Sequence, residues 1–199
     1  MTRRKESSAQ SDLTNAVADH FRGHERVVSA STETLASSAA AAGRAIIESL
    51  EGGGKVICFG NGGSATQASH LAQELVGRFR ARRRPHPAVS LASDAATITC
   101  IGNDFGYPAV FDRQMTAFAQ PGDVAIGLTT SGKSENVISA FVVARAKGAV
   151  TVALTGSAGL VGGEADHLIA VPSTDSAHIQ EVHLMVVHAW CAAIDEALP

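Results

Sequence analysis

Cysteine is scarce in this sequence, and the few cysteines have no regular spacing. Cys58, Cys100 and Cys191 stand far apart in a chain of 199 residues, with no CxxC pair among them. A disulfide framework of the kind that stabilises small secreted domains is therefore excluded. We expect three reduced thiols in an intracellular protein, each serving as a packing residue, because free cysteines are among the most often buried side chains.

Long apolar runs and an excess of charge of one sign are also missing. The N-terminal segment has no stretch apolar enough for a signal peptide, and no later segment approaches the ~20 apolar residues of a membrane helix. Sixteen basic residues against nineteen acidic ones leave a formal charge of −3, which gives no general attraction to nucleic acid or membranes. The sequence predicts a cytoplasmic protein without membrane or nucleic-acid partners.

One basic segment departs from this balance. Its arginines are Arg78, Arg80, Arg82, Arg83 and Arg84. Basic residues favour the C-terminal end of a helix, so a solvated helix end and loop is the favoured interpretation. A nucleic-acid site is the alternative, and it is weakened because Phe79 is the only aromatic residue among the arginines.

Short apolar runs alternate with helix-like stretches after an N-terminal helical region. Residues 1–12 are polar and expected to be flexible, and residues 13–52 indicate two helices, suited to oligomerisation, that separate near Ser31 or Thr32. The apolar runs predict buried strands at residues 55–59, 88–92, 123–128, 149–154 and 167–171. This βαβ alternation predicts one α/β domain over residues 1–199, with a doubly wound, five-stranded parallel sheet. Ligands bind such sheets beyond the carboxyl ends of the strands.

The segment from Gly60 to Ala65 follows the first predicted strand and opens a helix. Its glycines permit a tight turn, and the N–H groups of the helix start then converge on a site for negative charge. Further along the same helix, His70 and Glu74 are four residues apart and share one face. An anion site and a metal or acid/base pair are therefore predicted within one strand-turn-helix unit.

Two motif matches point to nucleotides, and their context argues against both. Gly60, Gly62 and Ala65 fit the relaxed dinucleotide fingerprint, but the acidic residue that should follow about twenty positions later is missing. Residues 127–134 satisfy the P-loop pattern literally, yet Gly127 falls inside a predicted strand, so the turn that remains is too short to wrap a nucleotide.

The second motif nevertheless supports a narrower hypothesis. The hydroxyl groups of Thr129, Thr130, Ser131 and Ser134, together with helix N-terminal amides, can bind one phosphate group. The alternative is a set of helix-capping side chains with no ligand, because serine and threonine are common caps.

The last predicted helix is apolar on most sides and carries embedded polar residues. Gln180 and His188 are about 80° apart around the helix, close enough to line one cavity, whereas His183 lies between them and can be structural. Each of these side chains needs a partner, because an unpaired buried polar group costs about 1–3 kcal/mol. A satisfied core hydrogen bond is the alternative for each.

These motifs together resemble the sugar isomerase (SIS) domain proteins, and among them the phosphoheptose isomerases. The resemblance spans residues 13–198 and rests on four segments: Gly60–Ala65 with His70 and Glu74, residues 101–107, residues 130–134, and residues 179–184 with His188. It implies a flavodoxin-like sheet and a homotetramer with active sites between subunits. It also implies one zinc ion per subunit, held by His70, Glu74, Gln180 and His188.

The same resemblance implies the reaction and the residues that contact the sugar phosphate. The reaction is the aldose–ketose isomerisation of D-sedoheptulose 7-phosphate to D-glycero-D-manno-heptose 7-phosphate through an enediol, a step of heptose biosynthesis. Glu74 and His188 are the implied catalytic acid/base groups, and zinc would polarise the sugar oxygens; the ligand types suit zinc, with manganese or nickel as alternatives. The implied substrate contacts are Asn61, Gly62, Gly63, Ser64, Glu74, Asn103, Asp104, Thr129, Thr130, Ser131, Ser134 and Gln180.

A different class of function is the main alternative to an isomerase. Some SIS proteins bind phosphosugars or regulate without catalysis, including ones that associate with a replication initiator, and these lack residues matching Glu74 and His188. The presence of both residues here favours an enzyme. A nucleotide-dependent kinase would rest on the literal P-loop match alone.

Overall fold

Five parallel strands form the centre of the protein. The structure, a computed structural model, describes the backbone of residues 2–199 and the side chains from Asp12 onward. The strands are β1 (Val56–Gly60), β2 (Ala88–Ser90), β3 (Val124–Thr129), β4 (Val150–Thr155) and β5 (His167–Ala170). They pair in the order β2-β1-β3-β4-β5, with every pair parallel. The predicted doubly wound sheet is confirmed, each strand within two residues of its expected bounds.

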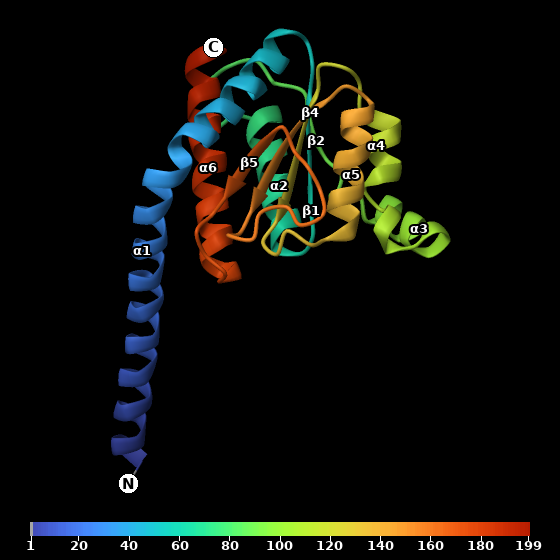
Figure 1. Ribbon diagram of the computed structural model, residues 1–199. Coiled ribbons are helices and arrows are strands. Elements are labelled where there is room, and N and C mark those ends of the chain that lie inside the picture. The colour runs from blue at the N-terminus through green and yellow to red at the C-terminus, as the bar shows by residue number, and fades with distance from the viewer. Residues whose placement is uncertain (1) are drawn as a thin grey trace.

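Helices cover both faces of the sheet (Figure 1). One face packs against α1 (Thr2–Glu51), α2 (Gly63–Val76) and α6 (Ser176–Ala197), and the other against α3 (Ala95–Phe105), α4 (Asp112–Phe118) and α5 (Glu135–Ala146). A short 3₁₀ helix, η1 (Tyr107–Ala109), joins α3 to α4. The strands feed both apolar layers because their successive side chains point to opposite faces. None of the described helices is long and apolar enough to cross a membrane.

The strand order reverses between β1 and β3, and this reversal creates a crevice. The chain leaves β1 toward β2 on one side and later returns to β3 on the other side, so Gly60 at the end of β1 pairs with Leu128 near the end of β3. The two connections that follow these strands, to α2 and α5, diverge to opposite faces. Ligand sites in open α/β sheets lie at such a point.

The N-terminal region is one continuous helix, so the predicted break near Ser31 or Thr32 is wrong. Thr32 Oγ1 donates to the carbonyl of Val28 at 3.0 Å, which satisfies the hydroxyl group inside the helix instead of ending it. Farther along, Trp190 Nε1 of α6 donates to the carbonyl of Ala39 at 2.8 Å and anchors the C-terminal half of α1. The expectation of flexibility at residues 1–12 falls almost entirely outside the residues whose side chains are described, and it stays a prediction.

Two of the three cysteines are packing residues, and the third is not. Cys58 and Cys191 are buried, and burial raises the pKa of both thiols, to about 12 for Cys191. Cys100 is exposed on α3, so the expectation that it packs in the core is wrong. Its segment looked apolar, but only Ile101 of α3 is buried.

The arginine segment also differs from its expected form at one position. The Arg83 side chain has no exposed surface and forms a 2.7 Å ion pair with Asp195 of α6. It also donates to the carbonyls of Leu75 and Glu74, at 2.9 and 2.8 Å. Arg83 is therefore a buried cap for the C-terminal end of α2, not a solvated loop residue.

Candidate active site

The turn after β1 is tied to the start of α5 by a pair of asparagine side chains. Asn61 and Asn136 exchange two hydrogen bonds of 2.9 Å, and Tyr107 donates its hydroxyl hydrogen to Asn61 Oδ1 at 2.8 Å. Gly62 has a φ of 54°, in the region that favours glycine. At Gly60 a Cβ atom would lie 2.8 Å from the carbonyl oxygen of Leu128. Glycine and amide side chains thus hold the two sides of the crevice together.

The helices that open onto this crevice begin without side-chain caps. Neither Gly62 at the start of α2 nor Ser134 at the start of α5 makes a capping hydrogen bond. By contrast, Asp94 and Asp175 cap α3 and α6 through their carboxylates. Uncapped N-terminal amides at a ligand crevice are the groups that bind phosphate.

The predicted hydroxyl cluster lies at the start of α5. Thr129 Oγ1 and Ser134 Oγ are 3.1 Å apart, and Ser131 Oγ accepts a hydrogen bond from the backbone amide of Lys133 at 3.2 Å. Thr130 Oγ1 accepts from Ser176 of α6 at 3.3 Å. The four hydroxyl groups therefore share one turn, and the cap interpretation fails for Ser134, whose hydroxyl faces Thr129 instead.

The P-loop match has a packing explanation. Gly127 lies within β3, and a Cβ atom there would approach Phe141 to 2.5 Å and Phe59 to 2.8 Å. The glycine is needed because two aromatic rings pack over the strand. This placement confirms that the motif does not form a nucleotide loop.

His70, Glu74 and His188 come together between α2 and α6. His70 Nε2 lies 3.1 Å from Glu74 Oε1 and 3.2 Å from His188 Nε2, although His70 and His188 are 118 positions apart in the sequence. His188 also stacks on Phe79, with ring centroids 5.5 Å apart. The structure therefore places three of the four predicted metal-binding side chains around one point.

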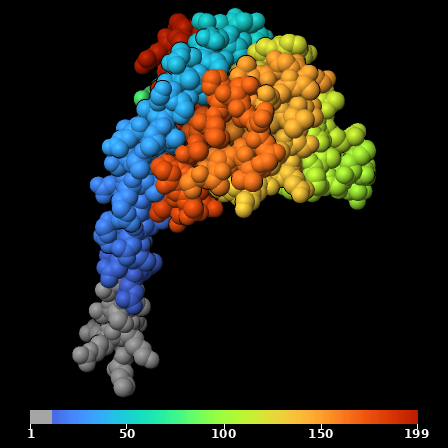
Figure 2. Space-filling model, in the orientation of Figure 1, coloured from blue at the N-terminus to red at the C-terminus, as the bar shows by residue number. Residues whose placement is uncertain are grey.

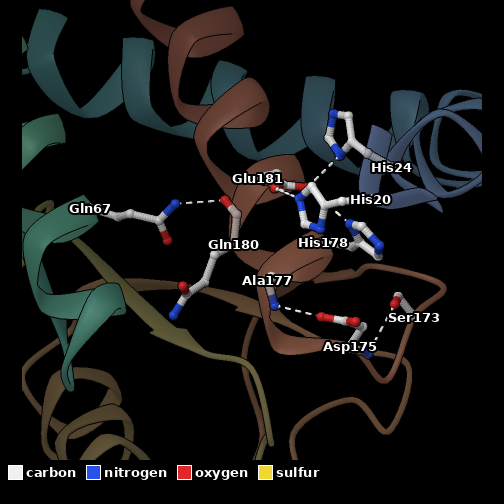
Figure 3. A network of polar contacts seen from close by, with 9 residues as sticks. All are labelled: His20, His24, Gln67, Ser173, Asp175, Ala177, His178, Gln180 and Glu181. Carbon is white, nitrogen blue, oxygen red and sulfur yellow. Dashed lines mark hydrogen bonds and ion pairs between the residues drawn. The ribbon is translucent and has the colours of Figure 1, made fainter. Parts of the chain in front are cut away.

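Gln180, the fourth predicted ligand, lies at the N-terminal end of α2. A Cβ atom on Gly63 would be 2.7 Å from its Nε2 atom, so the carboxamide rests against the helix start. Gln67 donates to the Gln180 backbone carbonyl at 2.6 Å and fixes this part of α6 (Figure 3). Among the described contacts, the Gln180 side chain lies against Gly63 of the anion-binding turn and does not touch the imidazoles. Ser64, the next residue of α2, is buried.

Asn103 and Asp104 make no described contact with the other residues of this crevice. Both are exposed near the end of α3, where Asn103 Nδ2 donates to Asp104 Oδ1 at 2.7 Å. Asp104 also accepts a weak hydrogen bond from Cys100. In the single chain their described contacts are with each other and with Cys100.

His183 is a structural residue, which was one of the two interpretations of this histidine in the sequence. It is fully buried, and its Nε2 donates to the carbonyl of Thr155 at 3.1 Å. Burial, only partly opposed by this hydrogen bond, lowers the pKa of His183 to about 4. A neutral imidazole in this position is a core group and takes no part in the site.

Sequence reasoning missed three residues that shape the site. Asn136 and Tyr107 orient Asn61, and Arg83 holds the carbonyl of Glu74. Tyr107 lies within residues 101–107 and Asn136 lies two positions after residues 130–134, and both segments belong to the family resemblance. For Asn136, an amide in the first helical turn after a serine-rich loop was a signal that the sequence offered. No feature of the sequence distinguished Arg83 from the four other arginines of its segment.

Known proteins are similar to this chain in sequence and in fold. Residues 19–156 match the SIS domain family. The phosphoheptose isomerase of Aliarcobacter butzleri is 41% identical over 187 residues, covering 94% of this chain and 99% of the relative. That of Maridesulfovibrio salexigens is 45% identical over 183 residues, covering 92% and 89%.

A solved structure extends the likeness to three dimensions. The phosphoheptose isomerase GmhA of Neisseria gonorrhoeae superposes with a TM-score of 0.84 at 36% identity, covering 92% of this chain and 99% of that chain. The family match spans most of the chain, and the relatives are covered almost end to end. The chain therefore belongs to the SIS domain family and, within it, to the phosphoheptose isomerases.

Proposed function

We propose that this protein is an aldose–ketose isomerase that converts D-sedoheptulose 7-phosphate to D-glycero-D-manno-heptose 7-phosphate. The observation that carries the proposal is the convergence of His70, Glu74 and His188, with nitrogen-to-oxygen and nitrogen-to-nitrogen distances of 3.1 and 3.2 Å. The names of the relatives support a phosphorylated heptose as the substrate. A cytoplasmic location is part of the proposal, supported by three free cysteines.

A zinc ion, one per subunit, fits the three converging side chains. Two imidazole nitrogens that face each other at 3.2 Å form a hydrogen bond only if one of them carries the proton. A cation accepts both lone pairs at once, and the carboxylate of Glu74 supplies a third donor. His70, Glu74 and His188 would hold the ion, with Gln180 reaching it from the helix start. When bound, zinc would act as a Lewis acid toward the sugar oxygens.

The protein side chains would carry out the proton transfers. Glu74 removes a proton from C1 of the ketose and delivers it to C2, while His188 takes the proton of the C1 hydroxyl group and supplies one to the oxygen on C2. The intermediate between these steps is the enediol, and no atom is gained or lost overall. General acid and base groups of this kind each contribute about 10²–10⁴-fold to a rate.

The remaining side chains would bind and orient the substrate. The turn at Thr129–Ser134 and the uncapped start of α5 offer hydroxyl and amide donors to the phosphate group. Asn61, fixed by Asn136 and Tyr107, has its amide held in one orientation for sugar hydroxyl groups. Asn103 and Asp104 would complete the set, supplied by this chain or by a neighbouring subunit.

A homotetramer with sites between subunits is the assembly we propose. Leu13, Val17 and Phe21 are exposed and spaced four residues apart, so they form one apolar stripe on α1. Figures 1 and 2 show this half of α1 extending beyond the rest of the domain. An apolar groove of about 560 Å³ lies between α1 and α6, and its lining includes Val28, Leu35, Ile47, Met185, Val186 and Trp190. A stripe and a groove of this kind on one chain can each be covered by another copy.

The assembly has a direct test. Light scattering of the purified chain should give four times the 20.4 kDa chain mass. Phe21→Asp should shift that mass toward smaller species, because it places a charge in the proposed interface. A monomeric wild-type chain would refute the tetramer.

The reaction is tested with the purified protein and its proposed substrate. When loaded with zinc, the protein should convert sedoheptulose 7-phosphate to an aldoheptose 7-phosphate, and NMR of the product follows this conversion. A zinc-loaded protein that binds the sugar phosphate without turnover would instead show a phosphosugar-binding or regulatory protein.

A further inference from the structure

A second cluster of histidines lies between α1 and α6, apart from the crevice (Figure 3). His20 Nε2 is 2.6 Å from Glu181 Oε1, and His178 Nδ1 is 3.0 Å from Glu181 Oε2. His24 Nδ1 lies 2.7 Å from Glu181 Oε2. Three of the eight histidines of the chain thus face one carboxylate.

The cluster is closely packed on its inner side. The His178 side chain is only 12% exposed, and it lies against Gly23 of α1, where a Cβ atom would be 2.6 Å from His178 Nε2. The rings of His20 and His178 are 4.6 Å apart. A glycine between His20 and His24 therefore makes room for an imidazole from the other helix.

Ordinary hydrogen bonds do not account for every donor in this cluster. His24 Nδ1 is buried and, despite its short distance to Glu181, has no partner in hydrogen-bond geometry. Glu181 thus has three imidazoles around it, and the one from His24 forms no hydrogen bond with it. A cation that takes the lone pairs of several rings at once would satisfy such an arrangement better than protons do.

We propose that His20, His178 and Glu181 bind a divalent transition-metal ion of the zinc class, with His24 as a further donor. The ligand atoms of the first three residues all lie within 4.8 Å of one another. Zinc bonds of about 2.0–2.1 Å place tetrahedral ligands about 3.3 Å apart, so the separations of 2.6 and 3.0 Å would lengthen by about 0.7 and 0.3 Å. His20 is 42% exposed and gives the ion access from solvent.

This site is separate from the proposed catalytic one. Gln180 and Glu181 are neighbours in α6, but Figure 3 shows their side chains pointing to opposite sides of the helix. The two sites share no ligand. An ion bound by the cluster would join α1 to the start of α6, next to the segment that positions Gln180.

Zinc binding at equilibrium tests the proposal. Dialysis against zinc followed by elemental analysis should find two ions per wild-type chain and one in His178→Gln or His20→Gln. The affinity of the cluster should weaken at least ~100-fold, because even indirect partners of a metal are worth 10–100-fold. His167→Gln, on β5 and outside both sites, is the matched control and should retain two ions. His20→Gln changes an exposed side chain and should leave the fold intact. It therefore tests the site even if the His178 variant misfolds.

A companion variant separates this site from the catalytic one. His70→Ala with His188→Ala should remove one ion and leave the ion of the cluster. Zinc should also raise the melting temperature of this double variant, and His178→Gln added to it should abolish that rise. If His20→Gln and His178→Gln bind as much zinc as the wild type, the cluster is a set of ion pairs and the proposal is overturned.

Discussion

Replacing Glu74 by glutamine should lower the rate of isomerisation by about 10²–10⁴-fold, because the amide cannot accept the carbon-bound proton. Glutamine keeps the shape of the side chain, which is only 14% exposed, and the backbone carbonyl that Arg83 holds is unchanged. The fold should therefore persist. His188→Gln should cause a loss of similar size, since an amide cannot exchange protons with the sugar oxygens.

Steady-state kinetics with sedoheptulose 7-phosphate would measure both losses, with zinc content determined on the same samples. Glu196→Gln makes the same chemical change as Glu74→Gln, on an exposed part of α6. His167→Gln makes the same change as His188→Gln, on β5. Both control variants should retain the wild-type rate. Full activity of the zinc-loaded Glu74→Gln variant would show that Glu74 takes no part in the proton transfer.

Replacing Asp195 by alanine should cost about 3–5 kcal/mol of folding stability, because it strands the buried charge of Arg83. Asp195 accepts from the amides of Arg80 and Ala81 at 2.8 Å as well as from Arg83 Nε at 2.7 Å. These four groups join the C-terminal end of α2 to α6. Urea unfolding monitored by circular dichroism measures the loss, and Glu196→Ala, at the next and exposed position, should lose less than about 1 kcal/mol.

The same carboxylate should make stability depend on pH. Burial opposes its ionisation, but the hydrogen bonds from Ala81, Arg80 and Arg83 outweigh burial and lower the pKa of Asp195. Because the folded pKa lies below the unfolded one, the contribution is fully present above the unfolded value of about 3.9 and is lost as pH falls through the folded value. The gap in unfolding free energy between wild type and Asp195→Ala should therefore narrow in acid. A constant gap would show that the charge of Asp195 is not what stabilises this contact.

The sheet was predictable because buried parallel strands read as continuous apolar runs. All six residues of β3 are buried, and their predicted bounds are off by only one position. The N-terminal helix was mispredicted for a local reason: serine and threonine often cap the start of a helix and so mark a boundary, but Thr32 bonds back to Val28 within the helix. Whether a hydroxyl group caps a helix or bonds backward depends on what packs beside it, and the sequence does not show this.

The proposed catalytic cluster was predicted in pieces. His70 and Glu74 were readable from their four-residue spacing, whereas their meeting with His188 depended on family resemblance and is now seen as a 3.2 Å contact. Arg83 was not readable, since its partner Asp195 lies 112 positions away. The exposure of Cys100 was missed because α3 buries only one of its residues.

Isomerisation of sedoheptulose 7-phosphate in D₂O tests the account most directly. If Glu74 carries the proton through an enediol and exchanges it with solvent before returning it, mass spectrometry and NMR of the heptose 7-phosphate should find deuterium at C2 of the product. The zinc-loaded Glu74→Gln variant should form almost none of this product. Product formed by zinc-loaded Glu74→Gln at the wild-type rate, or no product at all from the zinc-loaded wild type, would contradict the account.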